Sequence, residues 1–180
     1  FASAPGVAGI VAEFLPRPTI TPYLLHIGLA LVVVPLVWMV PEQRAVQAGP
    51  RRRSLIPTSL ITPRFLPVVA YAPWVFGSAT TAFVFLPAQL SEHLRHPILI
   101  AGLCAFLTMG SGVVIQQLAG RIRVSAFHSM VLAAVGMALC LAVLAAAHYG
   151  WAVFLLPIAA IVMGSSYGIG MLSGLCLLYT

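Results

Sequence analysis

The chain has 180 residues, of which 61% are hydrophobic and only 7% are charged, against about 25% charged residues in an average globular domain. Nine basic and three acidic side chains cannot cover a water-soluble globule of this length, and the high hydrophobic content excludes a disordered chain. The net charge of +6 comes from arginines that lie between apolar runs and form no basic face on a folded module. We therefore expect no nucleic-acid partner, and the lipid bilayer is the environment that fits.

Five apolar runs follow one another, and none of them contains a charged residue: 23–40, 66–90, 98–119, 126–147 and 151–178. In a helix, 18 residues reach about 27 Å, which is close to the thickness of the hydrocarbon core, about 30 Å. Residues 1–12 are also apolar but too short, and we interpret them as the second half of another span. The runs are apolar on all sides and lack the alternation of a β-barrel strand. The fold class predicted is an all-α, polytopic transmembrane helix bundle.

The charges lie in the connections, and their distribution predicts an orientation. The connections at 41–65 and 120–125 hold seven arginines, whereas those at 13–22, 91–97 and 148–150 hold two. Since arginine-rich connections stay in the cytoplasm, the first group is expected inside and the second outside. The three carboxylates, Glu13, Glu42 and Glu92, all fall in these connections, so we expect no proton-carrying carboxylate within a span. Abundant arginine without any lysine or asparagine favours a bacterium with GC-rich DNA, and thus its inner cell membrane.

Two short motifs and the order of the elements carry a resemblance to a known family. Residues 4–9, APGVAG, are similar to the Gly-Pro-x-x-Gly-Gly element in the fifth helix of major facilitator superfamily antiporters, with Pro5 and Gly9 matching. Residues 116–123, QQLAGRIR, resemble that family's Gly-x-Leu-Ala-Asp-Arg-x-Gly-Arg loop. Here Gly120 stands where the family has the aspartate, so the resemblance implies no charge-relay role at this position. A long basic connection between two sets of helices also resembles the middle of such a transporter.

The resemblance implies a division of the chain and a function. Residues 1–40 would end the N-terminal helical half, 41–65 would be the basic cytoplasmic linker, and 66–180 would be the first four helices of the C-terminal half. The function expected is secondary transport of a small molecule by alternating access, in contact with lipid and with the remaining helices of a longer chain. An integral membrane enzyme and a non-transporting membrane subunit or channel are the alternatives.

Candidate substrate-binding residues come from three of the runs. Tyr71, Trp74, Ser78 and Thr81 are spaced to lie on one side of a helix, and the resemblance makes that helix cavity-lining. The resemblance also makes the helix of the run 151–178 cavity-lining, and Ser166 and Tyr167 are the polar candidates on it. Gln116, near the inner end of the run 98–119, is a further candidate. Helix packing is the alternative for these positions, because hydroxyl side chains and the GxxxG patterns at 164–168 and 170–174 also join transmembrane helices.

No pattern of residues points to catalysis or to a bound cofactor. Aspartate is absent, no GxSxG motif occurs, and the histidines are scattered. Cys104, Cys140 and Cys176 each lie inside an apolar run, where a thiol behaves as a small hydrophobic group. We therefore expect the chain not to be an enzyme, and to hold neither a cofactor nor a metal.

Overall fold

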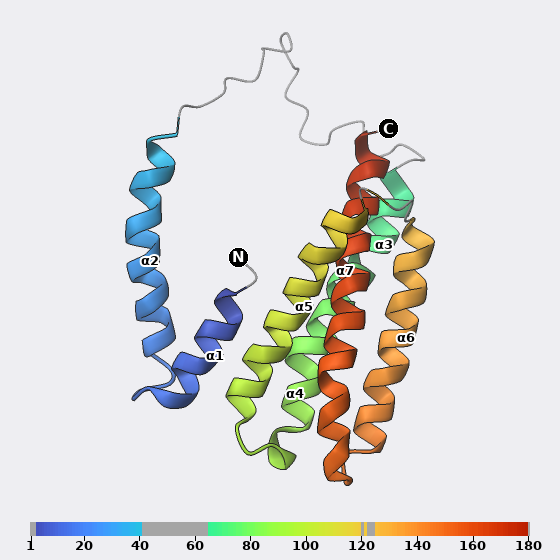
Figure 1. Ribbon diagram of the computed structural model, residues 1–180. Coiled ribbons are helices and arrows are strands. Elements are labelled where there is room, and N and C mark those ends of the chain that lie inside the picture. Colours follow the sequence, from blue (N-terminus) through green and yellow to red (C-terminus); the bar gives the residue numbers. More distant parts are fainter. Residues whose placement is uncertain (1–2, 41–64, 120, 122–124, 180) are drawn as a thin grey trace.

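The computed structural model describes residues 3–40, 65–119, 121 and 125–179, and within these ranges the chain forms helices and connections without strands. The α-helices, labelled in Figure 1, are α1 (Ala4–Phe14), α2 (Thr21–Trp38), α3 (Phe65–Thr80), α4 (Leu86–Gln89), α5 (Pro97–Ala119), α6 (Ala126–Ala145) and α7 (Leu156–Tyr179). A π-helical turn (Thr81–Phe85) joins α3 to α4, and 3-10 turns (Ser91–His93 and Gly150–Leu155) precede α5 and α7. The all-α prediction is confirmed for the described residues.

Five of the helical segments are long and apolar enough to cross a membrane: Thr21–Trp38, Val69–Gln89, Pro97–Ala119, Ala126–Ala145 and Gly150–Gly174. They correspond to the five apolar runs, and the protein is a multi-pass membrane protein by length and hydropathy. The α1–α2, α4–α5 and α6–α7 connections all lie at one end of the helices, at the bottom of Figure 1. The chain therefore runs up and down, as alternate spans require. The predicted linker falls on residues 41–64, outside the described residues.

The predicted position of one carboxylate is wrong. Glu13 was expected in the connection at 13–22, but it lies in the last turn of α1, which continues to Phe14. The helix extends this far because glutamate is a good helix former and because the carboxylate finds partners on α5. Pro16, two residues beyond the helix, stops it from continuing. Glu92 lies in a 3-10 turn between spans, as expected for a connection.

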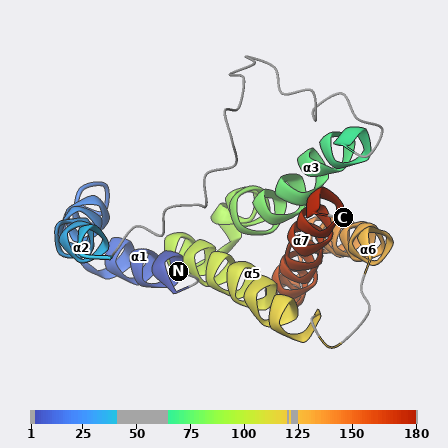
Figure 2. The same cartoon turned by 90° about the horizontal axis from the view of Figure 1, so that it is seen from above.

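Helix α7 lies at the centre of the bundle and packs against α3, α5 and α6, as the view from above shows (Figure 2). Its fully buried side chains Leu156 and Met163 meet Leu86, Leu90 and Val143 in one apolar core. Helix α1 packs against α5, whereas α2 packs only lightly against α1 and buries none of its residues. The described bundle therefore has a compact part around α7 and a thinner part attached through α1.

Glycines set how closely α7 approaches α5. A Cβ on Gly164 would collide with the carbonyl oxygen of Thr108, and one on Gly168 would collide with that of Gly112. The packing interpretation of the GxxxG pattern at 164–168 is thus confirmed, since small residues let two membrane helices meet at backbone distance. In the second pattern only Gly170 is closely packed, and it meets side chains: an added Cβ would lie 2.7 Å from Tyr71 Oη and 2.8 Å from Val75 Cγ2, whereas no described atom lies within 4 Å of one on Gly174.

The π-helical turn follows from Pro87. Proline has no N–H to give to the carbonyl four residues earlier, and its ring displaces that carbonyl. The chain widens just before it, and Leu86 N–H bonds to Thr81 O, five residues back. A wider turn rotates the residues that follow relative to those of α3. Residues from Tyr71 to Ser78 therefore keep the regular spacing of an α-helix, whereas residues beyond Thr81 no longer lie on the face that this spacing predicts.

Candidate functional site

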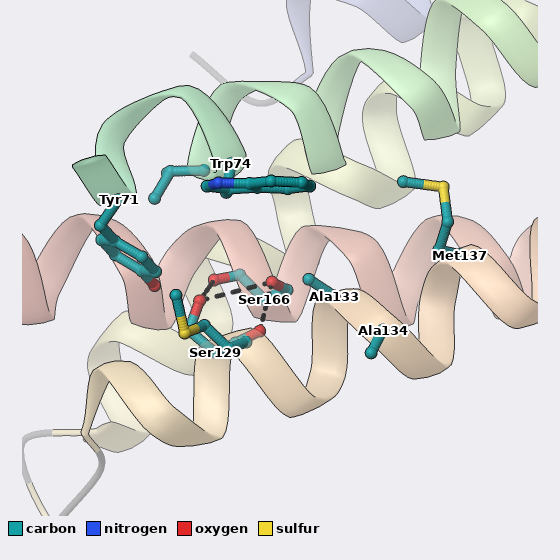
Figure 3. Close-up of a pocket in the computed structure, with 9 residues that line it drawn as sticks. Tyr71, Trp74, Ser129, Ala133, Ala134, Met137 and Ser166 are labelled. Atoms are coloured by element: carbon teal, nitrogen blue, oxygen red, sulfur yellow. Dashed lines mark hydrogen bonds between the residues drawn. The ribbon is translucent and has the colours of Figure 1, made fainter. Parts of the chain in front are cut away.

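A groove of about 330 Å³ lies between α3 and α6, with α7 as its floor (Figure 3). Three residues of α3, five of α6 and one of α7 line it: Tyr71, Trp74, Val75, Ser129, Met130, Ala133, Ala134, Met137 and Ser166. We call it the α3–α6 groove. Most of its lining is aromatic, thioether or methyl surface, which is the usual surface of a site for a small organic molecule.

The size difference between facing residues creates this space. On α3, Tyr71 and Val75 are buried against the bundle, whereas 65% of Trp74 is exposed at the rim. On α6, Ala133 and Ala134 stand opposite, flanked by Met130 and Met137. Two small side chains facing an indole ring leave a gap that neither helix fills, and the flexible methionines can adapt to different shapes.

A reciprocal pair of hydrogen bonds forms the polar part of the floor. Ser129 Oγ donates to the carbonyl oxygen of Ser166 at 2.7 Å, and Ser166 Oγ donates to that of Ser129 at 2.8 Å. Both serines are buried. The pair joins α6 to α7 and uses the hydroxyl protons of both residues, so these hydroxyls stabilise the wall of the groove.

The hydroxyl of Tyr71 is different, since it is buried and has no hydrogen-bond partner among the described residues. It points toward the Ser129–Ser166 pair (Figure 3). Ser129 Oγ gives its own proton to Ser166 O but keeps lone pairs that can accept a proton from Tyr71. The hydroxyl lies over Gly170, where an added Cβ would stand 2.7 Å from it. A buried hydroxyl that makes no hydrogen bond of regular geometry costs free energy, so this group gains if it donates fully to Ser129 Oγ or to a ligand.

The structure brings together three of the residues singled out from the sequence, Tyr71, Trp74 and Ser166. The others lie elsewhere in the bundle. Ser78 and Thr81 donate within their own helix, to Val75 O at 2.9 Å and to Gly77 O at 2.7 Å.

Tyr167 and Gln116 lie apart from the groove. The ring of Tyr167 packs edge-on against Phe76, with centroids 6.2 Å apart, and it also lies near Gly112 of α5. Gln116 is half-buried toward the C-terminal end of α5. Ser166 therefore faces the groove, whereas its neighbour Tyr167 faces Phe76 and α5.

Helix α6 supplies most of the groove, and sequence reasoning assigned it no site residue. A signal was present, because Ser129 is a hydroxyl in an apolar run, and Met130, Ala133 and Met137 follow at helical spacing. Residue spacing along one helix does not show which other helix packs against that face. Only the packing of α6 beside α3 places these residues opposite Trp74.

Histidine, cysteine, aspartate and glutamate side chains do not gather in threes at any place within the described ranges where they could hold a metal ion. Cys104 and Cys140 are free and buried, which confirms the interpretation of these two thiols as small core groups. Comparisons of the chain with protein-family models, with curated proteins and with solved structures find no match. Among the described residues, five helices are long and apolar enough to cross a membrane, which supports a polytopic membrane protein and identifies no family.

Proposed function

We propose that the protein is a secondary transporter, of the major facilitator type, that moves a small and largely apolar molecule by alternating access. The observation that carries this proposal is the α3–α6 groove, which has the volume of a small-ligand site and opens between two membrane-spanning helices. A molecule dissolved in the bilayer can reach such a groove without leaving the apolar phase.

The lining indicates what kind of molecule fits. The exposed indole of Trp74 offers a flat surface, and Met130 and Met137 offer adaptable contacts on the other wall. None of the described residues that line the groove is charged. The hydroxyl of Tyr71 is buried beneath the groove, so it would meet a ligand's acceptor, for instance a carbonyl oxygen, when the Tyr71 ring turns from Ser129 toward the groove. The substrate class proposed is a planar, uncharged molecule with a single acceptor group.

The arrangement of the helices also supports movement between two parts. Helices α1 and α2 meet the compact part mainly through the contact of α1 with α5. Helix α3, which forms one wall of the groove, contains Pro73 and ends in the π-helical turn. A helix with these interruptions bends more readily than a regular one, and π-helical turns frequently occur at functional sites.

The proposal includes an orientation and a location, and it assigns the chain no catalytic role. The end of the bundle that holds the α1–α2, α4–α5 and α6–α7 connections would face outside, in the inner membrane of a bacterium. The support is the excess of arginine in the connections at the other end.

The groove can be blocked by one substitution and tested with a matched control. Ala133→Phe places a ring in the groove, whereas Val135→Phe places the same ring on an exposed position of α6 outside it. The full-length protein would be reconstituted in vesicles, and uptake of a fluorescent planar aromatic ketone would be measured relative to protein-free vesicles. We expect Ala133→Phe to reduce uptake to near background and Val135→Phe to retain it.

Two results would contradict the proposal. Equal uptake by the two variants would exclude the groove from the substrate path. Absence of uptake above protein-free vesicles by the parent protein, under imposed ion gradients of either direction, would favour a non-transporting membrane protein.

A further inference from the structure

Glu13 is a partly buried carboxylate at the end of α1, the short helix that attaches the thinner part of the bundle. Its side chain is only 13% exposed. A carboxylate so far removed from water needs partners, because burial of an unpaired charge is costly. Both of its oxygens have one on α5 or directly before it.

The contacts of Glu13 join α1 to the start of α5. His96 Nδ1 donates to Glu13 Oε1 at 2.8 Å, and Leu99 N–H donates to Oε2 at 3.2 Å. Leu99 is in the first turn of α5, where backbone N–H groups have no partner within the helix and the helix dipole favours a negative charge. The ring of Phe14 lies beside His96, with centroids 6.1 Å apart.

The rest of the contact between α1 and α5, which we call the α1–α5 seam, consists of close packing at glycines. Gly9 meets Gly102 at backbone distance, since a Cβ on Gly9 would lie 2.9 Å from Gly102 Cα. A Cβ on Gly6 would lie 3.2 Å from Phe106 Cβ. The glycines thus allow close approach, and one large side chain, Phe106, packs over Gly6. Directional hydrogen bonds between α1 and α5 occur, within the described ranges, only at Glu13.

We propose that Glu13 and His96 act as a clasp that holds the outer ends of α1 and α5 together in one state of the transport cycle and must open in the other. The inference rests on the proposed transport function. Among the described residues the polar contacts of the α1–α5 seam lie at one end, so the two helices can separate at that end once these contacts are broken. Glu13 is in this sense a positioning residue, because it lies outside the groove and acts through His96 and α5.

The test measures how easily the outer end of the seam opens. A single cysteine replaces Ala12, a half-buried residue next to Glu13, in full-length protein whose Cys104, Cys140 and Cys176 are changed to alanine. A membrane-impermeant maleimide is then added from the outside of vesicles. We expect Glu13→Gln and His96→Ala each to raise the labelling rate roughly tenfold, as expected when a hydrogen bond to a charged group is lost. The double variant should label no faster than either single variant, because both remove the same contact.

Glu92→Gln is the matched control, since Glu92 is an exposed carboxylate in the next outer connection, and it should leave labelling unchanged. In uptake of the planar ketone, Glu13→Gln should change the maximal rate and leave KM unaltered, because Glu13 does not contact the groove. Unchanged labelling in both single variants, or rates that multiply in the double variant, would overturn the clasp. If the parent takes up no ketone yet labelling responds as expected, the transport proposal fails while the contact itself stands.

Discussion

The α1–α5 seam and the α3–α6 groove are two helix–helix contacts with opposite designs. In the seam, Gly9 and Gly102 bring the backbones together, and the one carboxylate has a partner for each oxygen. In the groove, Trp74 faces alanines across an open space, and the Tyr71 hydroxyl beneath it has no partner among the described residues. The α1–α5 seam is closed and has a polar contact at one end, whereas the α3–α6 groove is open and its lining is mainly apolar.

The difference shows that residue size alone does not decide whether two membrane helices meet. Small residues occur on both sides of the seam but on only one side of the groove. When both partners are small, the backbones approach and the contact closes. When one partner is an aromatic residue held at the rim, the small residues opposite leave room for a ligand.

The largest expected effect is at the closed seam. A Cβ on Gly102 would lie 2.8 Å from Gly9 Cα and 3.0 Å from Pro5 O, and backbone atoms cannot rotate away. We expect Gly102→Leu to lower the free energy of unfolding by about 3 kcal/mol, the upper part of the usual range for overpacking. Unfolding of the purified protein in mixed detergent micelles would measure it.

Gly110→Leu is the control for this prediction, because it changes the same helix at a position where no described atom lies within 4 Å of an added Cβ. If both variants lose the same stability, the cost comes from the loss of glycine itself and the seam is not tightly closed.

A smaller effect is expected at the floor of the groove. Ser129→Ala removes one of the two reciprocal hydrogen bonds between α6 and α7 and should cost about 1 kcal/mol, as for other hydrogen bonds between membrane helices. Ser173→Ala provides the comparison, because Ser173 is also buried but donates to Ile169 O of its own helix. The same unfolding measurement should show Ser173→Ala nearer to the parent; the reverse order would mean that the pair does not hold the floor together.

The smallest effect on stability is expected at Tyr71. Tyr71→Phe removes a hydroxyl that has no partner in the described structure, so the free energy of unfolding should stay the same or rise by up to about 1 kcal/mol. Binding of the planar ketone, followed by quenching of tryptophan fluorescence, should weaken in the same variant. A loss of stability as large as that of Ser129→Ala would show that the hydroxyl already has a partner and is not available to a ligand.

The sequence predicted the spans well because each span is a continuous apolar run, which depends only on residues next to one another in the chain. The five runs all became helices. The prediction for Glu13 failed because local signals, a charge followed by Pro16, favour a connection. What extended the helix was a partner more than eighty residues away in the chain, at His96 and Leu99.

The candidate site was predicted only in part, for a related reason. The spacing of Tyr71, Trp74 and Ser78 shows that they lie near one another on a helix, but not which neighbour each meets. The structure directs Tyr71 and Ser166 toward α6, whereas Tyr167, one residue from Ser166, lies against Phe76 and near α5. Adjacent residues of a helix point about 100° apart, so they serve different interfaces.

By itself, the sequence indicated a membrane environment, the helical class, the five long spans found among the described residues and the connections in which the arginines gather. These properties follow from composition and from periodicity within single segments. The tertiary structure decided the glycine seam between α1 and α5, the pairing of Glu13 with His96, and the groove between α3 and α6. Each of these depends on which helices are neighbours, because a contact between two helices is a property of both surfaces and neither surface specifies it alone.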